Sequence, residues 1–224
     1  MARNTPVTDG DNGHLISARL RAPQAAAIAG IIFSGLLICS LWLLRLSVPA
    51  NPLEAGEWLE SGAGRVAFAV NLVPFAGIAF LWFIGVLRDR LGKLEDQFIS
   101  TVFLGSGLLF LGMMFVAAAA AGGLILAYSA QPKALFDSGT FVFVRAFTFG
   151  AMQIYAFRMA AVFMITTSTL AIRTHFIARW IAFLGYASAV FLLLGSAYVD
   201  WAVFVFPIWV LLVSGYILMD NLTG

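Results

Sequence analysis

The chain has 224 residues, of which 62% are hydrophobic and only 11% are charged, and its mean hydropathy is +0.96. Soluble globular domains carry about 25% charged residues. The composition therefore excludes an ordinary soluble protein and indicates an integral membrane protein.

Six runs of the sequence are long and apolar enough to cross a bilayer, whose hydrocarbon core is about 30 Å thick and needs roughly 20 apolar residues per helix. They span residues 24–46, 66–87, 99–127, 140–172, 177–197 and 202–219. The predicted fold class is therefore all-α, a polytopic membrane protein with a bundle of six transmembrane helices. Residues 1–23 lack aromatic side chains and are rich in polar and turn-forming residues, which predicts a flexible cytoplasmic tail. Residues 220–224 are predicted as a short cytoplasmic C-terminus.

Basic residues are distributed unevenly between the two ends of the predicted spans. The end that holds both termini carries eight of them, namely Arg3, Arg19, Arg21, Arg88, Arg90, Lys93, Arg173 and Arg179. The opposite end carries three, namely Arg45, Arg65 and Lys133. Because short cytoplasmic loops are enriched in Lys and Arg, both termini are predicted to be cytoplasmic.

Small residues and one proline bear on how the spans pack. Gly30 and Ser34 in the first span, and Gly185 in the fifth, occupy positions that allow close helix approach in lipid. In the second span Pro74 removes a backbone hydrogen bond and predicts a kink, where the amide of Asn71 is placed to satisfy the freed backbone groups. A broken helix that grips a ligand, as in transporters, is the alternative interpretation.

The fourth span carries two arginines in an otherwise apolar run. Arg145 and Arg158 are thirteen positions apart, which places them roughly 140° apart around an α-helix with some 20 Å of rise between them. They therefore do not form one stripe, which argues against a single anion channel lined by both. Arg145 lies near the outer end and is predicted to be an interfacial anchor that reaches lipid headgroups or pairs with Asp137 or Asp200.

Arg158 lies near the middle of the same span. An arginine at the bilayer centre costs at least about 2.5 to 3.5 kcal/mol, so it needs partners or water. In α-helical geometry Tyr155 and Thr169 share its face, and we expect Arg158 to be buried against carbonyl and hydroxyl groups of neighbouring helices. A polar cavity for an anionic headgroup or a small anion is the alternative. The candidate residues for a ligand or anionic lipid are Arg158, Gln153, Asn71, Tyr155 and Arg145.

Titratable side chains are otherwise missing from the middle of the predicted spans, where the sequence has no Asp, Glu, His or Lys. This pattern argues against a proton relay, a retinal Schiff base or a bis-histidine haem. The single cysteine, Cys39, lies inside the first span and is interpreted as a small packing residue. No catalytic residue, metal ligand or cofactor is predicted, and the chain is not expected to be an enzyme.

Two segments, "FLWFIGVLRDRLG" at 80–92 and "FIARWIAFLGYASAVFLLLGS" at 176–196, carry a resemblance. They resemble the corresponding parts of a group of uncharacterised bacterial six-helix integral membrane proteins. In that group a Trp-Phe and then Leu-Arg stretch ends the second span, and an Arg-Trp pair opens the fifth before a Leu-Gly step. The resemblance implies a protein of the bacterial inner membrane and transfers no catalytic residue.

The predicted function is that of a non-enzymatic accessory or scaffold subunit of a membrane assembly. Its expected partners are membrane lipid and either other membrane-protein subunits or further copies of the chain, with no nucleic acid. The alternative is a small transporter or channel with a polar cavity around Asn71, Gln153 and Arg158. An intramembrane enzyme acting on lipid ranks below both, because the sequence offers no nucleophile and base pair.

Overall fold

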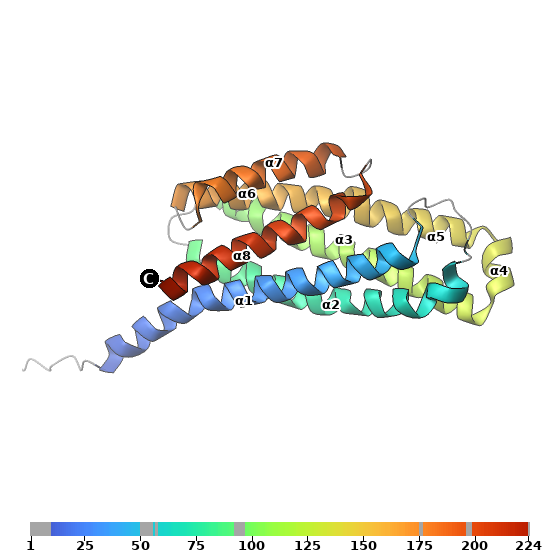
Figure 1. Cartoon of the computed structure of the whole chain (residues 1–224), viewed down its shortest axis with the longest axis horizontal. Helices are drawn as coiled ribbons and strands as arrows, with labels where there is room; N and C mark the ends of the chain where they lie inside the picture. The colour runs from blue at the N-terminus through green and yellow to red at the C-terminus, as the bar shows by residue number, and fades with distance from the viewer. Residues whose placement is uncertain are drawn as a thin grey trace, which may run out of the picture.

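The computed structural model describes residues 10–49, 56, 58–91, 97–174, 177–195 and 199–223. Every regular element among them is helical, so the predicted all-α class is confirmed for this part of the chain. In chain order the elements are α1 (Gly10–Ser47), α2 (Trp58–Leu91), α3 (Gln97–Ala130), α4 (Pro132–Asp137), α5 (Thr140–Phe149), η1 (Gly150–Ala156), α6 (Phe157–Thr174), α7 (Arg179–Gly195), η2 (Asp200–Phe204) and α8 (Val205–Thr223) (Figure 1).

Five of the described helical segments are long and apolar enough to cross a membrane, as in an integral membrane protein. They are Gln24–Ser47, Trp58–Arg88, Gln97–Ala130, Thr140–Thr174 and Asp200–Asp220. The fourth consists of α5, η1 and α6 in continuous succession. The predicted span at 177–197 corresponds to α7, an apolar helix of only 17 residues. At 1.5 Å per residue α7 is about 25 Å long, somewhat short of a hydrocarbon core of about 30 Å.

The two predicted terminal segments extend the bundle helices instead of standing apart from them. α1 begins at Gly10, so residues 10–23 of the predicted flexible tail belong to a helix, while residues 1–9 lie outside the described residues. α8 likewise runs through to Thr223. Extending an existing helix avoids the cost of nucleation, and the stretch "LISARLRA" contains mostly good helix formers.

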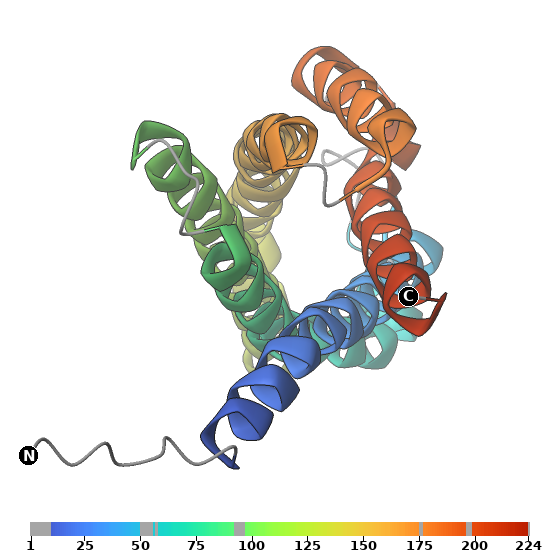
Figure 2. The same ribbon diagram turned by 90° about the vertical axis from the view of Figure 1, so that its left-hand side faces the viewer.

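The long helices form a ring in which each packs on the next. α1 contacts α2, α2 contacts α3, α3 contacts the α5–η1–α6 helix, α6 contacts α7, α7 contacts α8, and α8 contacts α1. The view along the bundle shows this order (Figure 2). The start of α1 and the end of α8 lie at one end of the bundle, and α4 lies at the other (Figure 1).

Phenylalanine rings fill the centre of this ring of helices. We call Phe33, Phe80, Phe110, Phe163 and Phe206 the aromatic cluster; they come from α1, α2, α3, α6 and α8. Each is at most 1% exposed, and the rings that contact one another have centroids 4.5 to 6.3 Å apart. Such spacings are those of favourable aromatic pairs. The cluster therefore ties five helices together at one level of the bundle.

The small residues of α1 and α7 lie where helices approach closely, as predicted. A Cβ atom added at Gly30 would collide with the side chains of Ser214 and Phe83. One added at Gly185 would collide with those of Ser168 and Trp209. In lipid, this close approach supplies much of the packing energy between helices.

Candidate ligand-binding cavity

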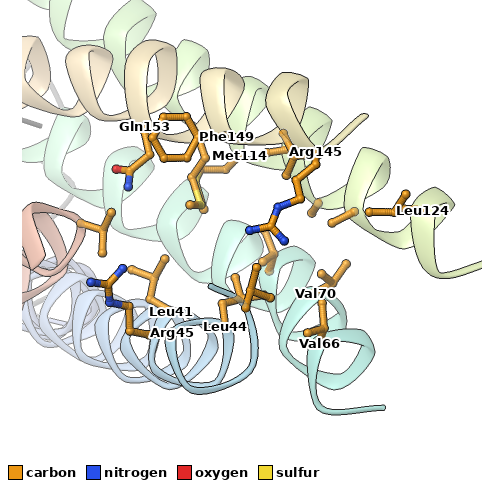
Figure 3. A pocket seen from close by; sticks show the side chains of 18 of the residues that line it. Leu41, Leu44, Arg45, Val66, Val70, Met114, Leu124, Arg145, Phe149 and Gln153 are labelled. Carbon is orange, nitrogen blue, oxygen red and sulfur yellow. The ribbon is translucent and has the colours of Figure 1, made fainter. Parts of the chain in front are cut away.

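A cavity of about 160 Å³ lies between α1, α2, α3, the α5–η1 segment and η2 (Figure 3). It occupies the half of the bundle that ends at α4. Its apolar wall includes Leu41, Leu44, Val66, Val70, Val73, Met114, Leu124, Phe149 and Met152. A cavity of about 150 Å³ in another protein holds a benzene molecule, so this space has room for a small apolar group or a part of an acyl chain.

The aromatic cluster closes this cavity toward the other half of the bundle. Met114 of the cavity wall lies one helical turn after Phe110 of the cluster, and Val203 lies three residues before Phe206. On α2, Val73 lies two turns from Phe80. Because these phenylalanine rings are almost fully buried, the cavity ends at a packed floor and does not continue along the bundle axis.

Arg145 of α5 lines the cavity and is only 6% exposed. Its Nη2 donates a hydrogen bond to the carbonyl oxygen of Pro49 at 2.8 Å, and its guanidinium lies 5.6 Å from the centroid of the Trp58 ring. The prediction of an interfacial anchor is therefore wrong in its location: the side chain turns inward to a backbone carbonyl and an indole face. Both contacts suit a planar, weakly hydrated cation.

A second arginine, Arg45 at the end of α1, also lines the cavity. Its Nη2 is 2.8 Å from Oδ2 of Asp200, and its guanidinium lies 5.3 Å from the centroid of the Trp201 ring. Asp200 was predicted as a partner of Arg145, but the structure pairs it with Arg45. Sequence reasoning therefore missed Arg45 and Trp58 as cavity residues. The available signal was that each arginine lies at the same end of the bundle as a tryptophan.

Apart from Arg145, the cavity wall holds two buried polar atoms that have no hydrogen-bond partner within the described part of the chain. They are Oε1 of Gln153, a residue that is 6% exposed, and Nε1 of Trp58. Buried polar groups are nearly always hydrogen-bonded, and leaving one unsatisfied costs about 1 to 3 kcal/mol. One atom is an acceptor and the other a donor, so a polar ligand or water in the cavity would satisfy both.

The π-helical segment η1, Gly150–Ala156, positions Gln153 in the cavity wall. A π-helical turn accommodates an extra residue and shifts the phase of all later side chains by about 100° relative to a continuous α-helix. Such segments frequently occur at functional sites. In Figure 3 the amide of Gln153 and the guanidinium of Arg145 point from this helix toward α1 and α2.

The other predicted site residues do not join this cavity. Arg158 and Tyr155 are exposed on the outside of the bundle, so the predicted burial of Arg158 is wrong. Burial was predicted from the cost of an arginine in lipid, whereas the helix that follows η1 turns Arg158 to the outside of the bundle. Asn71 is also exposed, and its Nδ2 donates to the carbonyl oxygen of Ala67 at 2.9 Å. The helix α2 continues through Pro74. Of the five predicted site residues, the cavity brings together Arg145 and Gln153.

Residues that would bind a metal are not gathered in the described part of the chain, where no group of three or more His, Cys, Asp or Glu side chains occurs. Cys39 is free and exposed on α1. The cavity wall carries guanidinium, indole and amide groups and the Asp200 carboxylate paired with Arg45, beside apolar side chains, a set of groups suited to binding a polar headgroup together with an apolar chain.

Comparison with known proteins gives no family assignment, since no protein-family model, curated protein or solved structure matches the chain. The resemblance to bacterial six-helix membrane proteins stays a prediction.

Proposed function

We propose that the protein is a non-enzymatic accessory protein of a membrane assembly and that its cavity binds one amphiphile with an acidic headgroup, such as a phospholipid. Under this proposal the acyl chain lies against Val66, Val70 and Met114. The headgroup oxygens accept hydrogen bonds from the guanidinium groups of Arg145 and Arg45, which suit phosphate or carboxylate geometry. The observation that carries the proposal is the pair of unsatisfied buried atoms on Gln153 and Trp58 within an otherwise apolar wall.

The proposed topology has six spans with both termini in the cytoplasm of a bacterium. α7 runs antiparallel to α6 and α8 (Figure 1) and supplies the sixth crossing. The eight-to-three distribution of basic residues in the sequence supports the orientation. The cavity then opens in the outer half of the membrane, away from the cytoplasmic ends of the helices.

A channel or transporter formed around Asn71, Gln153 and Arg158 receives no support from the geometry. Only Gln153 of these residues lines the cavity. The packed aromatic cluster also ends the cavity at mid-bundle. We therefore retain the accessory role with bound lipid.

A thermal-shift titration of the delipidated protein tests this proposal. Phosphatidylglycerol should raise the melting temperature more than phosphatidylcholine does, because a ligand that binds only the folded state stabilises it by mass action. Ala121 lines the cavity, so Ala121→Leu should abolish this difference. Ala119 is exposed on the same helix, so Ala119→Leu is the matched control and should preserve the difference. Equal shifts by both lipids in the wild-type protein would exclude an acidic headgroup site.

A further inference from the structure

We propose that Arg158 and the exposed face around it form a docking site for a transmembrane helix of a different protein that carries a carboxylate near the middle of the bilayer. The proposal concerns the outer surface of the α5–η1–α6 helix. Arg158 does not line the cavity, so this surface and the lipid proposal stand on separate observations.

The depth of Arg158 follows from its place on the long helix. It lies thirteen residues after Arg145 and fifteen before Arg173, which corresponds to about 20 Å and about 22 Å of helix. The hydrocarbon core is about 30 Å thick. Its neighbour Phe157 contacts Phe110 of the aromatic cluster, with ring centroids 6.3 Å apart. Arg158 therefore lies close to the bilayer midplane. At this depth both interfaces are farthest away, so snorkelling brings the guanidinium least effectively to water.

The surroundings of Arg158 offer it no counter-charge. Its side chain is exposed, and the described residues include neither an ion-pair partner nor a hydrogen-bond partner for it. Charged side chains within membrane helices normally face a protein interior or a partner and pair with an opposite charge. Facing lipid is the unfavourable alternative, so the geometry points to an absent neighbour.

The acidic residues of this chain cannot supply that neighbour from a second copy. All eleven Asp and Glu residues lie in the N-terminal tail, in connections or near helix ends, and they are Asp9, Asp11, Glu54, Glu57, Glu60, Asp89, Glu95, Asp96, Asp137, Asp200 and Asp220. A symmetric dimer with parallel membrane orientation would bring Arg158 beside apolar residues or another Arg158. Charge complementarity therefore indicates a heterologous partner.

The exposed face has the chemistry of a helix-docking surface. Phe143 and Phe147 are exposed and stack with ring centroids 6.3 Å apart, and Tyr155 is 60% exposed. The rings of Phe143 and Phe147 lie toward the outer end of the long helix. The guanidinium of Arg158 and the phenol of Tyr155 lie near its middle. A partner helix would pack on the rings and place its carboxylate beside Arg158 and the hydroxyl of Tyr155.

A defined peptide probe tests the proposal in vesicles of phosphatidylcholine. The probe is a labelled Leu/Ala transmembrane peptide with one central Asp, and its matched control carries Asn at that position. Energy transfer to the labelled full-length protein measures association. We expect the Asp peptide to bind the wild-type protein at least about threefold more tightly than the Asn peptide, in the range measured for polar contacts between membrane helices.

Three variants decide the interpretation of the peptide experiment. Arg158→Leu should remove the preference for Asp, Arg158→Lys should retain it, and Arg173→Leu at the helix end should leave it unchanged. A wild-type protein without the preference, or a preference that persists in Arg158→Leu, would overturn the proposal. So would dimerisation of the chain, or retention of an acidic lipid, that depends on Arg158. The phosphatidylglycerol shift should survive in Arg158→Leu, which separates failure of this proposal from failure of the lipid proposal.

Discussion

The centre of the bundle and the half that ends at α4 differ in how the space between the helices is filled. At its centre, interlocking phenylalanine rings from five helices leave almost no exposed surface. In the half that ends at α4, the segments α1, α2, α3, α5–η1 and η2 line a cavity whose wall carries Arg45, Arg145, Gln153 and Trp58. Because a void with unsatisfied polar atoms is unfavourable by itself, the contrast with the packed centre supports the proposal that the half ending at α4 binds a ligand.

Breaking the aromatic cluster should have the largest effect on stability. Phe80→Ala removes a fully buried ring that contacts the other rings of the cluster, and such substitutions cost about 3 to 5 kcal/mol. Phe75→Ala on the same helix is the control, because Phe75 is 61% exposed. Unfolding titrations in mixed micelles measure the difference. Equal effects of both substitutions would contradict a packed centre.

The two arginines of the fourth membrane helix should differ in how much the same substitution destabilises the protein. Arg145→Leu removes the hydrogen bond to Pro49 and the contact with Trp58, so it should reduce the free energy of unfolding by about 1.5 to 3 kcal/mol. Arg158→Leu, which removes no hydrogen bond or ion pair within the described residues, should change it by less than about 0.5 kcal/mol in detergent. The same unfolding titration compares them. A larger loss from Arg158→Leu would mean that its side chain is held inside the bundle.

Replacing Gln153 separates stability from binding. Gln153→Met keeps the length of the side chain but removes the unsatisfied amide, so the delipidated protein should become more stable by about 1 kcal/mol. The same change should reduce the thermal shift that phosphatidylglycerol produces. Thermal unfolding with and without lipid measures both effects. A loss of stability without lipid would show that Gln153 serves the fold and not a ligand.

The ion pair at the cavity mouth should have the smallest effect. Arg45 and Asp200 have side chains that are 25% and 47% exposed, and exposed pairs contribute about 0.2 to 1 kcal/mol. A double-mutant cycle of Arg45→Gln and Asp200→Asn measures their coupling in detergent. A coupling well above this range would indicate that lipid or protein shields the pair from water.

Helix positions and close contacts were predictable because they depend on local composition. The apolar runs at 24–46 and 99–127 lie within helices of the structure, and Gly30 and Gly185 lie at tight crossings as small residues should. The hydroxyls of Thr166, Thr167 and Thr169 donate to carbonyls in the preceding turn of α6, which is the ordinary behaviour of threonine within a helix.

The cavity was not predictable because it depends on helix phase and on contacts between distant segments. Nothing in "GAMQIYA" distinguishes a π-helical turn from an α-helical one, yet η1 changes which side chains face inward. The pairing of Arg45 with Asp200 joins residues 155 positions apart. Burial of Arg145 likewise depends on Pro49 and Trp58, which only the ring arrangement of helices brings to it.

Native mass spectrometry of the protein extracted in mild detergent tests the central claim most directly. The account predicts one acidic phospholipid retained per chain by the wild-type protein and by Ala119→Leu, and its loss from Ala121→Leu, whose added methyl groups fill the cavity. Equal retention by Ala121→Leu and Ala119→Leu, or a wild-type chain that carries no lipid, would contradict a lipid-binding cavity.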